Sequence, residues 1–286
     1  NVVSSVIQSS DGSIWVGTGS ESGGGIQTGG GLAKFDGVNW TVFNTATSNI
    51  PSNTITDVIQ SADGYIWVST ADGGFAKFNG INPYGFTVYN TSNSPLTDNR
   101  VNEIFQDSHD NIWLSVGPFW GNYIGGAAKF DGDSLNSWVL YTTQNSPLLS
   151  RAIRNILEDS QNNIWLATTN GLYKFDGNST SGWDIYRREN SDISGNYLET
   201  VYESTNGDFW VGTYHEGLSV LRRCNITCTS PIPTVEWQNT IGGTDADDCI
   251  VFIKPTMVVI YWEDIVNRAY QVTKLIYAAE KMIIGL

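Results

Sequence analysis

Few residues in this 286-residue sequence are of the types that usually carry chemistry. The two histidines are His109 and His215. His109 lies in a tight Asp-Ser-His-Asp turn, where a solvated side chain is expected, so a Ser-His-Asp arrangement would have to assemble around the other histidine from distant segments. The 29 acidic residues always offer pairs of the kind that hydrolyse glycosides, so such pairs have no weight without geometry. We therefore predict no catalytic residues.

Metal and cofactor sites are not predicted either. Cys224 and Cys228 flank a three-residue loop, and they either pair in an oxidising compartment or remain thiols. Two histidines and three cysteines cannot supply a typical zinc site unless carboxylates dominate it. The acidity would suit calcium, but no Asp-x-Asp-x-Asp-Gly calcium loop is present. The glycine runs within residues 23–31 lack the Walker lysine and join two predicted strands, so they are not a phosphate-binding loop.

The charge balance excludes other partners. Lys and Arg together number 15 against 29 Asp and Glu, which gives a net charge of −14. Such a surface repels phosphate backbones, so we predict no nucleic-acid partner. No stretch reaches the roughly 20 apolar residues needed to span a bilayer. The sequence begins with Asn and shows no secretory leader, which is expected of a mature form or a fragment.

The strongest signal is an internal repeat built on a tryptophan-bearing strand. The tryptophans lie 52, 46, 52 and 45 residues apart, a spacing typical of propeller blades. The five copies occupy residues 14–18, 66–70, 112–116, 164–168 and 209–213.

Each copy sits within a predicted meander of four strands. An apolar strand and a tight turn such as Asp63-Gly64 precede it, because these residues tolerate the positive φ of a hairpin. A strand ending in Lys-Phe-Asp/Asn-Gly and a fourth aromatic strand follow, except in the fifth repeat, which lacks the fourth strand. A lone sheet of this kind exposes two apolar faces, so neighbouring sheets must cover it. We predict an all-β propeller of antiparallel four-stranded blades with its aromatic residues packed between blades.

These residues resemble the two-component regulator propeller repeat, whose pattern is D-x-x-G-x-I-W-V-G-T-x-x-G-G-L-x-K-F-D-G. Residues 159–177 match it closely, and the resemblance extends from residue 1 to about residue 222. It implies either the sensor region of a bacterial hybrid two-component system, often one that responds to carbohydrate, or a secreted protein. It implies no catalytic residues, because the shared pattern is structural.

The repeats divide the first part of the chain. We place the propeller at residues 1–223, with blades at 1–53, 54–99, 100–150, 151–196 and 197–223, followed by a linker at 224–234. Asn1 aligns with Asn53 and Asn99, so we expect an upstream repeat. The five blades either close a ring or form part of a larger one.

Residues 235–286 are interpreted as a truncated second repeat region. Residues 235–248 resemble the W-x-x-T-x-G-G repeat of secreted Bacteroidetes-type proteins, but the composition changes beyond Asp248. Back-translation of residues 256–260, read two bases later, permits Asp-Gly-Gly-Tyr, which that repeat would supply next. We hypothesise a frameshift over residues 249–286, and the competing interpretation is a short amphipathic tail.

A ligand site is predicted on the top face, which holds the turns after each tryptophan strand and the connections between repeats. Two of these turns are long: residues 19–31, expected to be flexible, and residues 117–126. Aromatic residues suit stacking on sugar rings and arginine suits carboxylates, whereas the alternative is that these aromatic residues cover their own blade and the arginines pair with local acids. The candidate ligand-binding residues are Phe119, Trp120, Tyr123, Arg100, Arg151 and His215.

The sequence favours a noncatalytic binding or sensing propeller that is exported to the periplasm or the cell exterior. Its expected partner is a small molecule, an oligosaccharide or another protein. The alternative is a structural or adhesive platform within a large secreted surface protein. A propeller lyase or glycosidase is a third hypothesis, because a fold alone does not give a function.

Overall fold

The computed structural model describes residues 2–22, 25–118, 125–132, 137–222, 248–253 and 256–261. For residues 20–29 and 248–261 this description covers the backbone only. Every regular element in these ranges is a β-strand. Consecutive strands pair as antiparallel meanders, as the repeat predicts.

Four sheets have four strands each, and a fifth has three. The first contains β1 (Val3–Gln8), β2 (Ile14–Ser22), β3 (Gly25–Phe35) and β4 (Trp40–Phe43). The second contains β5 (Ile55–Gln60), β6 (Ile66–Thr70), β7 (Phe75–Phe78) and β8 (Phe86–Tyr89). The third contains β9 (Val101–Gln106), β10 (Ile112–Val116), β11 (Gly126–Phe130) and β12 (Val139–Thr142). The fourth contains β13 (Ile153–Glu158), β14 (Ile164–Thr168), β15 (Gly171–Phe175) and β16 (Asp184–Tyr186). The fifth contains β17 (Leu198–Glu203), β18 (Phe209–Thr213) and β19 (Leu218–Leu221), and no fourth strand joins it among the residues that the structure describes.

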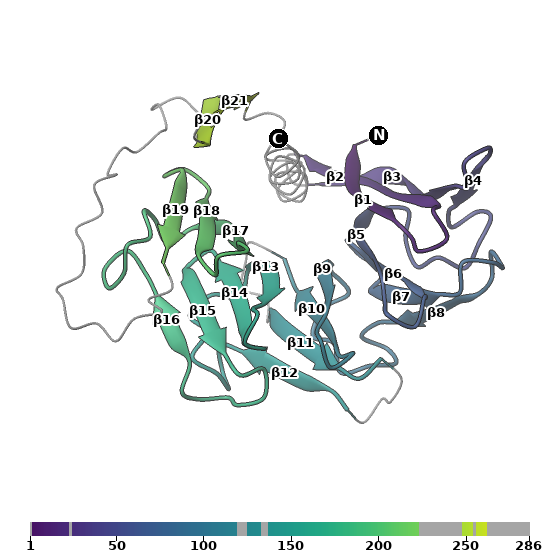
Figure 1. Ribbon diagram of the computed structural model, residues 1–286. Helices are drawn as coiled ribbons and strands as arrows, with labels where there is room; N and C mark the ends of the chain where they lie inside the picture. Colours follow the sequence, from purple (N-terminus) through teal and green to yellow (C-terminus); the bar gives the residue numbers. More distant parts are fainter. Residues whose placement is uncertain are drawn as a thin grey trace.

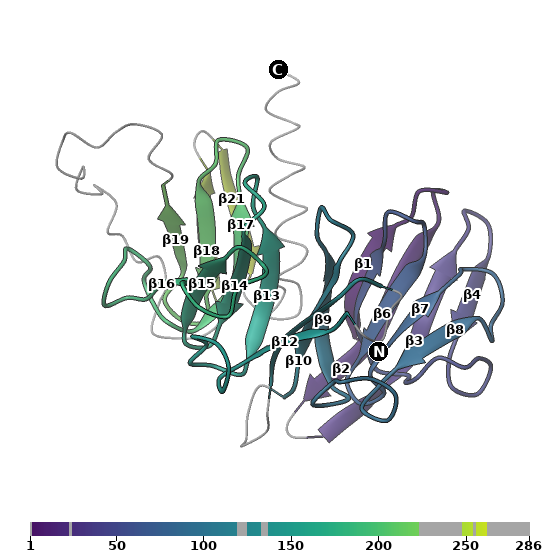
Figure 2. The ribbon, with the colours of Figure 1, turned by 90° about the horizontal axis from the view of Figure 1, so that it is seen from below.

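The five sheets follow one another around an arc, like the blades of a propeller (Figures 1 and 2). The first strand of each sheet is innermost and contacts the first strand of the next, from β1 to β5, β9, β13 and β17. Figure 1 shows the first and the fifth sheets lying apart at the two ends of the arc. The bottom face of this arc holds the turns between the first and second strands, and the top face holds the turns between the second and third strands and the connections between sheets.

Tryptophan and phenylalanine fill the interfaces between neighbouring sheets. The first four repeat tryptophans are at most 3% exposed. The Trp67 ring meets Phe130 of the next sheet edge-on at 5.8 Å, and Trp113 meets Phe175 in the same way at 5.8 Å. Aromatic pairs of this geometry add about 0.5–1.5 kcal/mol to the stabilisation from burial. For these four tryptophans, and for Phe130 and Phe175, the prediction of an aromatic core between blades is confirmed.

Two aromatic residues at the ends of the arc depart from that prediction. Trp210, the fifth tryptophan of the repeat, is half-buried, and Trp40 of β4 is 59% exposed. Trp40 stacks on Phe35 at 5.0 Å, as Trp138 stacks on Phe130 at 4.5 Å in the third sheet. The internal pair packs against the preceding sheet. Among the described residues, no sheet precedes the first, and only a two-stranded sheet follows the fifth along the chain.

The prediction of a long flexible loop at residues 19–31 was wrong. β2 and β3 continue to pair beyond the body of the sheet, from Ser20 opposite Gln27 to Ser22 opposite Gly25. A register shift between Thr18 and Ser20 introduces this extension. Glycine is required at residue 31, where this extension begins, because φ is +94° and a Cβ would lie 2.2 Å from the Phe43 carbonyl oxygen.

The predicted domain boundaries at residues 223 and 234 stay predictions, because residues 223–247 lie outside the described part of the chain. The W-x-x-T-x-G-G segment at 235–248 falls almost entirely in that stretch. Beyond it, β20 (Asp248–Ile253) pairs with β21 (Thr256–Tyr261). The hypothesis of a shifted reading frame over residues 249–286 also stays a prediction.

Candidate functional site

Each innermost strand carries a β-bulge at the same place. The register with the second strand shifts after the first residue, so the second residue is extra. A bulge increases the local twist and re-aims the side chain of the extra residue. The five bulge residues, all at the top end of their strands, are Ser4, Thr56, Asn102, Arg154 and Glu199.

Arg154 connects the fourth sheet to the fifth. Its Nη2 donates to the Tyr197 hydroxyl and lies 3.7 Å from Glu199 Oε1. The guanidinium also lies over the Tyr197 ring at 5.4 Å, a contact worth about 0.5–2 kcal/mol. Tyr197 stacks on Tyr214 at 4.8 Å, and His215 meets Tyr214 edge-on at 4.2 Å. A cation and two tyrosines are therefore held together on the top face.

Arg100 extends this arrangement toward the third sheet. Its Nε donates to Asn102 Oδ1 at 2.9 Å. Burial, and next the charge of Arg154, lower the pKa of Arg100 below its usual value. Two guanidinium groups thus share half-buried surroundings, where an anionic or strongly accepting group would be favoured. The name top-face row is used below for Arg100, Arg154, Tyr197, Tyr214 and His215.

Both ends of the 117–126 turn lie at the predicted arginines. Gly117 N–H donates to the Arg100 carbonyl at 2.9 Å, and Asn102 Nδ2 donates to the Gly117 carbonyl at 2.8 Å. A Cβ on Gly125 would lie 2.7 Å from the Arg151 carbonyl oxygen. The turn is therefore rooted on the same face as the top-face row.

The sequence identified this site only in part. Arg100 and His215 belong to the top-face row, Arg151 lies at the base of the turn, and Phe119, Trp120 and Tyr123 lie outside the described residues. Sequence reasoning missed Arg154, Tyr197 and Tyr214. The available signal was the polar second residue of every first strand, which marks the bulge.

On the bottom face, the turn before each tryptophan holds the indole in one of two ways. In the second sheet, Trp67 Nε1 donates to Ser61 Oγ at 3.0 Å, and Ser61 in turn donates to Asp63. In the third sheet, Trp113 Nε1 donates directly to Asp107 Oδ2 at 2.8 Å. The first sheet repeats the former arrangement and the fourth repeats the latter. One carboxylate thus serves each of these turns, either at its rim or beside the indole.

Ser108, His109 and Glu158 lie together but not as a catalytic triad. Ser108 Oγ donates directly to Glu158 Oε1 at 2.8 Å. His109 Nδ1 is 3.3 Å from Ser108 Oγ and 3.9 Å from the same Glu158 oxygen, whereas a triad needs opposite ring nitrogens to face the serine and the acid. Ser160 and Glu203 form the same pair at 2.7 Å without a histidine. The contact is therefore a clamp between neighbouring sheets.

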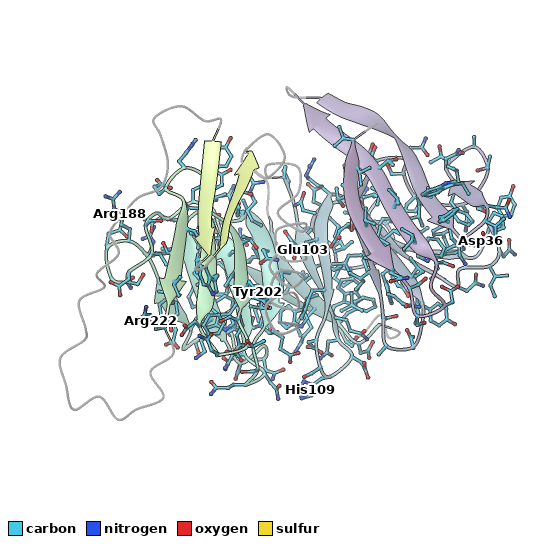
Figure 3. The ribbon with its side chains drawn as sticks, turned by 45° about the horizontal axis from the view of Figure 1, so that its top comes forward. Asp36, Glu103, His109, Arg188, Tyr202 and Arg222 are labelled. Carbon is cyan, nitrogen blue, oxygen red and sulfur yellow. The ribbon has the colours of Figure 1, made fainter. Side chains whose placement is uncertain are left out.

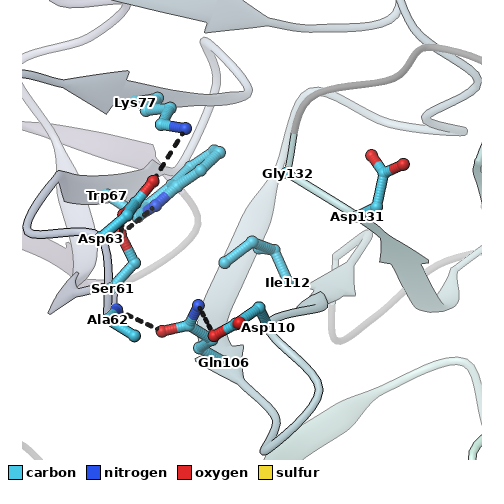
Figure 4. A pocket seen from close by; sticks show the side chains of 10 residues that line it. All are labelled: Ser61, Ala62, Asp63, Trp67, Lys77, Gln106, Asp110, Ile112, Asp131 and Gly132. Atoms are coloured by element: carbon cyan, nitrogen blue, oxygen red, sulfur yellow. Dashed lines mark hydrogen bonds and ion pairs between the residues drawn. The ribbon is translucent and has the colours of Figure 1, made fainter.

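Two clefts open on the bottom face between neighbouring sheets. The larger, of about 390 Å³, lies between the second and third sheets (Figure 4). Lys77 and Asp63 form one wall, and Gln106, Asp110 and Asp131 form the other. The smaller cleft, of about 200 Å³, occupies the equivalent place between the third and fourth sheets.

Two carboxyl groups lie at the interface of the innermost strands. Asp57 Oδ2 accepts the Ile104 N–H at 3.2 Å, and Glu103 Oε1 accepts from Asn155 Nδ2 at 2.8 Å. Burial raises the pKa of Asp57 to about 6. Burial, and next the Asp57 charge, raise the pKa of Glu103 well above 4.5. Glu103 is half-buried as a residue, but its Oε2 is shielded from solvent and has no hydrogen-bond partner. Figure 3 shows Glu103 in the interior and His109 at the rim.

Two further properties concern the described residues only. They contain no group of three or more His, Cys, Asp or Glu side chains arranged to hold a metal ion. They also contain no helix with the length and apolar character required to cross a membrane.

The sequence model of the two-component regulator propeller family matches residues 1–20, 49–72 and 147–170. The chain carries two-component regulator propeller repeats. The matched segments cover the first strands and tryptophan strands of three of the five sheets. A search of curated proteins finds no match to this propeller.

Solved structures share its fold. The extracellular domain of a hybrid two-component system of B. thetaiotaomicron is 22% identical, with a TM-score of 0.60 over 78% of this chain and 28% of that one. PorZ, a bacterial surface component of the type-IX secretion system of Porphyromonas gingivalis, is 16% identical, with a TM-score of 0.55 over 87% of this chain and 35% of that one. Virginiamycin B lyase of Staphylococcus aureus is 12% identical, with a TM-score of 0.53 over 79% and 71%. The propeller thus spans about a third of the first two structures, and at these identities the likeness is one of fold.

Proposed function

We propose that this chain is a noncatalytic sensing or binding propeller of an exported protein, and that it binds a small molecule or glycan on its top face. The observation that carries the proposal is the top-face row, which joins two arginines, two tyrosines and a histidine beside the base of an enlarged turn. Such a mixture of flat rings and charge-bearing donors suits a ring-shaped ligand with accepting groups.

Two further observations support the proposal. The fold recurs in the extracellular domain of a hybrid two-component system of B. thetaiotaomicron, which supports sensing and export. The Ser108, His109 and Glu158 clamp has a geometry that does not fit nucleophilic catalysis, which supports a noncatalytic role. The propeller fold itself does not exclude an enzyme, since a lyase of Staphylococcus aureus shares it.

The test measures binding of the chain to a panel of monosaccharides, oligosaccharides and small carboxylates by calorimetry. Arg154→Gln and Tyr214→Ala should each weaken binding of a panel ligand at least tenfold, because each removes a charged hydrogen bond or a stacking surface. Arg188→Gln is the matched control, since Arg188 is an exposed arginine of the outer rim, labelled in Figure 3. A Trp120→Ala/Tyr123→Ala variant tests the turn. Full affinity in all three site variants would refute the proposal.

A structural or adhesive platform is the second candidate function. The observation in its favour is the exposed apolar surface at one end of the arc, where Val38 is 81%, Trp40 59% and Val42 49% exposed. Contiguous apolar surface of this kind marks contact sites between proteins or domains. The Trp40→Ser variant tests whether this surface contributes to ligand binding. If the variant binds all panel ligands as the parent chain does, the ligand site lies on the top face and not on this surface.

A further inference from the structure

The side of the first sheet that faces away from the second sheet is an apolar surface. Ile7, Trp15 and Phe43 pack toward the second sheet, and the residues next to them along each strand point to the opposite side. The name leading face is used below for six residues on that opposite side. The strand register aligns them in two rows, Val6 with Val16 and Val42, and Ile14 with Phe35 and Trp40.

The leading face is open to solvent at its outer edge. Trp40 and Val42 are 59% and 49% exposed, and the other four residues are only partly buried. Figure 1 shows the first sheet at one end of the arc, and in the part of the chain that the structure describes no sheet precedes it.

The third sheet has the same apolar surface at the same register positions, but there the surface is covered. The equivalent residues in its first three strands are at most 2% exposed, because the second sheet lies against them. The first sheet therefore carries a surface that another repeat sheet covers elsewhere in the same molecule. The six equivalent residues are Ile104 with Leu114 and Leu140, and Ile112 with Phe130 and Trp138.

The cover over the third sheet is a stack of three aromatic rings. Trp67, Phe75 and Tyr89 come from the second, third and fourth strands of the second sheet. Their ring centres lie 5.8, 5.7 and 5.5 Å from that of Phe130, which is the equivalent of Phe35. Phe75 also contacts the ring beside Phe130 on the fourth strand of the third sheet.

Two of these rings recur where other sheets meet. Phe175 of the fourth sheet contacts Trp113 at 5.8 Å and Tyr141 at 5.1 Å, and these come from the second and fourth strands of the third sheet. The interface between the first and second sheets repeats this arrangement. The partner of the phenylalanine is therefore an indole from a second strand together with a ring from a fourth strand.

A second copy of the chain does not supply this partner. The tryptophan sides of its first four sheets are already covered by the next sheet. Its fifth sheet presents Trp210, but Leu218 stands where the second sheet has Phe75, and the described residues add no fourth strand. A complete four-stranded sheet of the repeat supplies both rings.

The connections between sheets indicate where such a sheet would be attached. Asn53 Oδ1 accepts the Thr45 N–H at 2.8 Å, and the Asn53 carbonyl accepts the Gly31 N–H at 3.0 Å. This asparagine thus ties the start of the second sheet to the end of the first. Asn99 and Asn196 make the equivalent contacts with the sheets that precede them. In the sequence, Asn1 stands two residues before the first strand, as these three asparagines do.

We propose that the leading face seats a further four-stranded sheet of this repeat, joined to the chain ahead of Asn1. The indole of that sheet would lie over Phe35, as Trp67 lies over Phe130, and its fourth strand would cover Trp40. This inference does not depend on the top-face ligand. It assigns to the surface around Trp40 a repeat sheet in place of the partner of an adhesive platform.

The test adds such a sheet to the full chain. One extended chain carries a copy of residues 54–98 ahead of Asn1, and another carries a copy of residues 151–195, so that Asn1 follows each copy as Asn99 and Asn196 follow the originals. Hydroxyl-radical footprinting with mass spectrometry measures the oxidation of Trp40. Its rate should fall about threefold or more in at least one extended chain, because Trp183, which stacks on Phe175 in the equivalent way, is only 8% exposed. His109, exposed on the third sheet, is the internal reference and should be oxidised equally in all chains.

The matched control keeps the added sheet but removes its rings. Trp67→Ser with Tyr89→Ser, made only in the copied segment, should return the oxidation of Trp40 to the parental rate. Thermal unfolding gives a second readout. Trp40→Ser should lower the unfolding midpoint by less than about 2 °C in the parent chain and by about 5 °C or more in the extended chain, where the ring is buried.

Two results would overturn the proposal. If Trp40 is oxidised at the parental rate in both extended chains, the leading face does not accept a repeat sheet, and the adhesive platform becomes the better account of it. If the parent chain associates in analytical ultracentrifugation and Trp40→Ser abolishes the association, the occupant is a second copy.

Discussion

The buried carboxyl group of Asp57 makes the stability of the inner interface depend on pH in a direction that follows from its pKa. Burial raises this pKa from 3.8 to about 6, which corresponds to about 3 kcal/mol. Because the folded pKa is the higher one, the folded chain binds the proton more tightly than the unfolded chain. The contribution of Asp57 to stability is therefore fully present below about pH 4 and is lost as the pH rises to about 6.

The substitution Asp57→Asn removes this titration. The two oxygens of the Asp57 carboxylate accept the backbone N–H groups of Val58 and Ile104. The amide of the variant keeps one accepting oxygen, but it turns its NH2 group toward the other N–H donor. That mismatch lowers the free energy of unfolding by a constant amount at every pH. The free energy of unfolding of the variant, relative to the parent chain, should nevertheless shift by about 3 kcal/mol in favour of the variant between about pH 4 and pH 7.

The assay is urea unfolding followed by tryptophan fluorescence at several pH values, for the parent and the variant. Asp36→Asn is the control, because hydrogen bonds from Asn39 and Val38 lower the pKa of this exposed carboxyl, so any pH effect has the opposite sign. A difference between Asp57→Asn and the parent that stays constant across the pH range would refute the reasoning. So would a shift in favour of the parent.

Two other predictions concern the repeat. Trp113→Phe should lower the free energy of unfolding by about 2–3 kcal/mol, because it removes part of a buried ring system and the hydrogen bond to Asp107. Trp210→Phe should lower it by less than about 1 kcal/mol, since Trp210 is half-buried. Urea unfolding of the two variants compares these losses. Gly74→Ala should cost more than about 2 kcal/mol, because φ is +86° and the added Cβ would lie 2.1 Å from a carbonyl oxygen, and Gly12→Ala, at φ +84° with open space, should cost about 1 kcal/mol. Thermal unfolding compares the two glycine variants. Equal losses for the two tryptophan variants, or for the two glycine variants, would contradict the corresponding prediction.

The sheets could be predicted because their signals are local. Tryptophan recurs every 45–52 residues, aromatic residues alternate along the strands, and tight turns such as Asp63-Gly64 mark each hairpin. Burial at the ends of the arc was not local, because the exposure of Trp40 depends on whether another sheet lies against it. The extension of β2 and β3 escaped prediction since glycines read as a loop, although Gly31 serves a close approach between strands.

The top-face row shows a different limit. Arg100 and His215 are placed by connections whose side of the sheet follows from strand direction, so the sequence identified their face. Arg154 lies inside a strand, where alternation alone assigns its side chain to one face of the sheet. The bulge re-aims it toward Tyr197 of the next sheet, and a bulge appears in the sequence only when five repeats are aligned.

The bottom face indicates how one fold of repeated sheets acquires different sites. A buried indole N–H requires an acceptor, and in the first four sheets the turn before it also holds a carboxylate. Ser61 with Asp63 meets both needs with the carboxylate at the rim, and Asp107 meets both with the carboxylate inside. The fold accepts either solution. Lys77 stays beside the rim carboxylate of its own sheet and Lys129 crosses to the next sheet, whereas Lys174, whose turn is of the second kind, stays on its own sheet beside Asp184. The bottom face can therefore differ from one interface to the next without a change in the packing of the tryptophans.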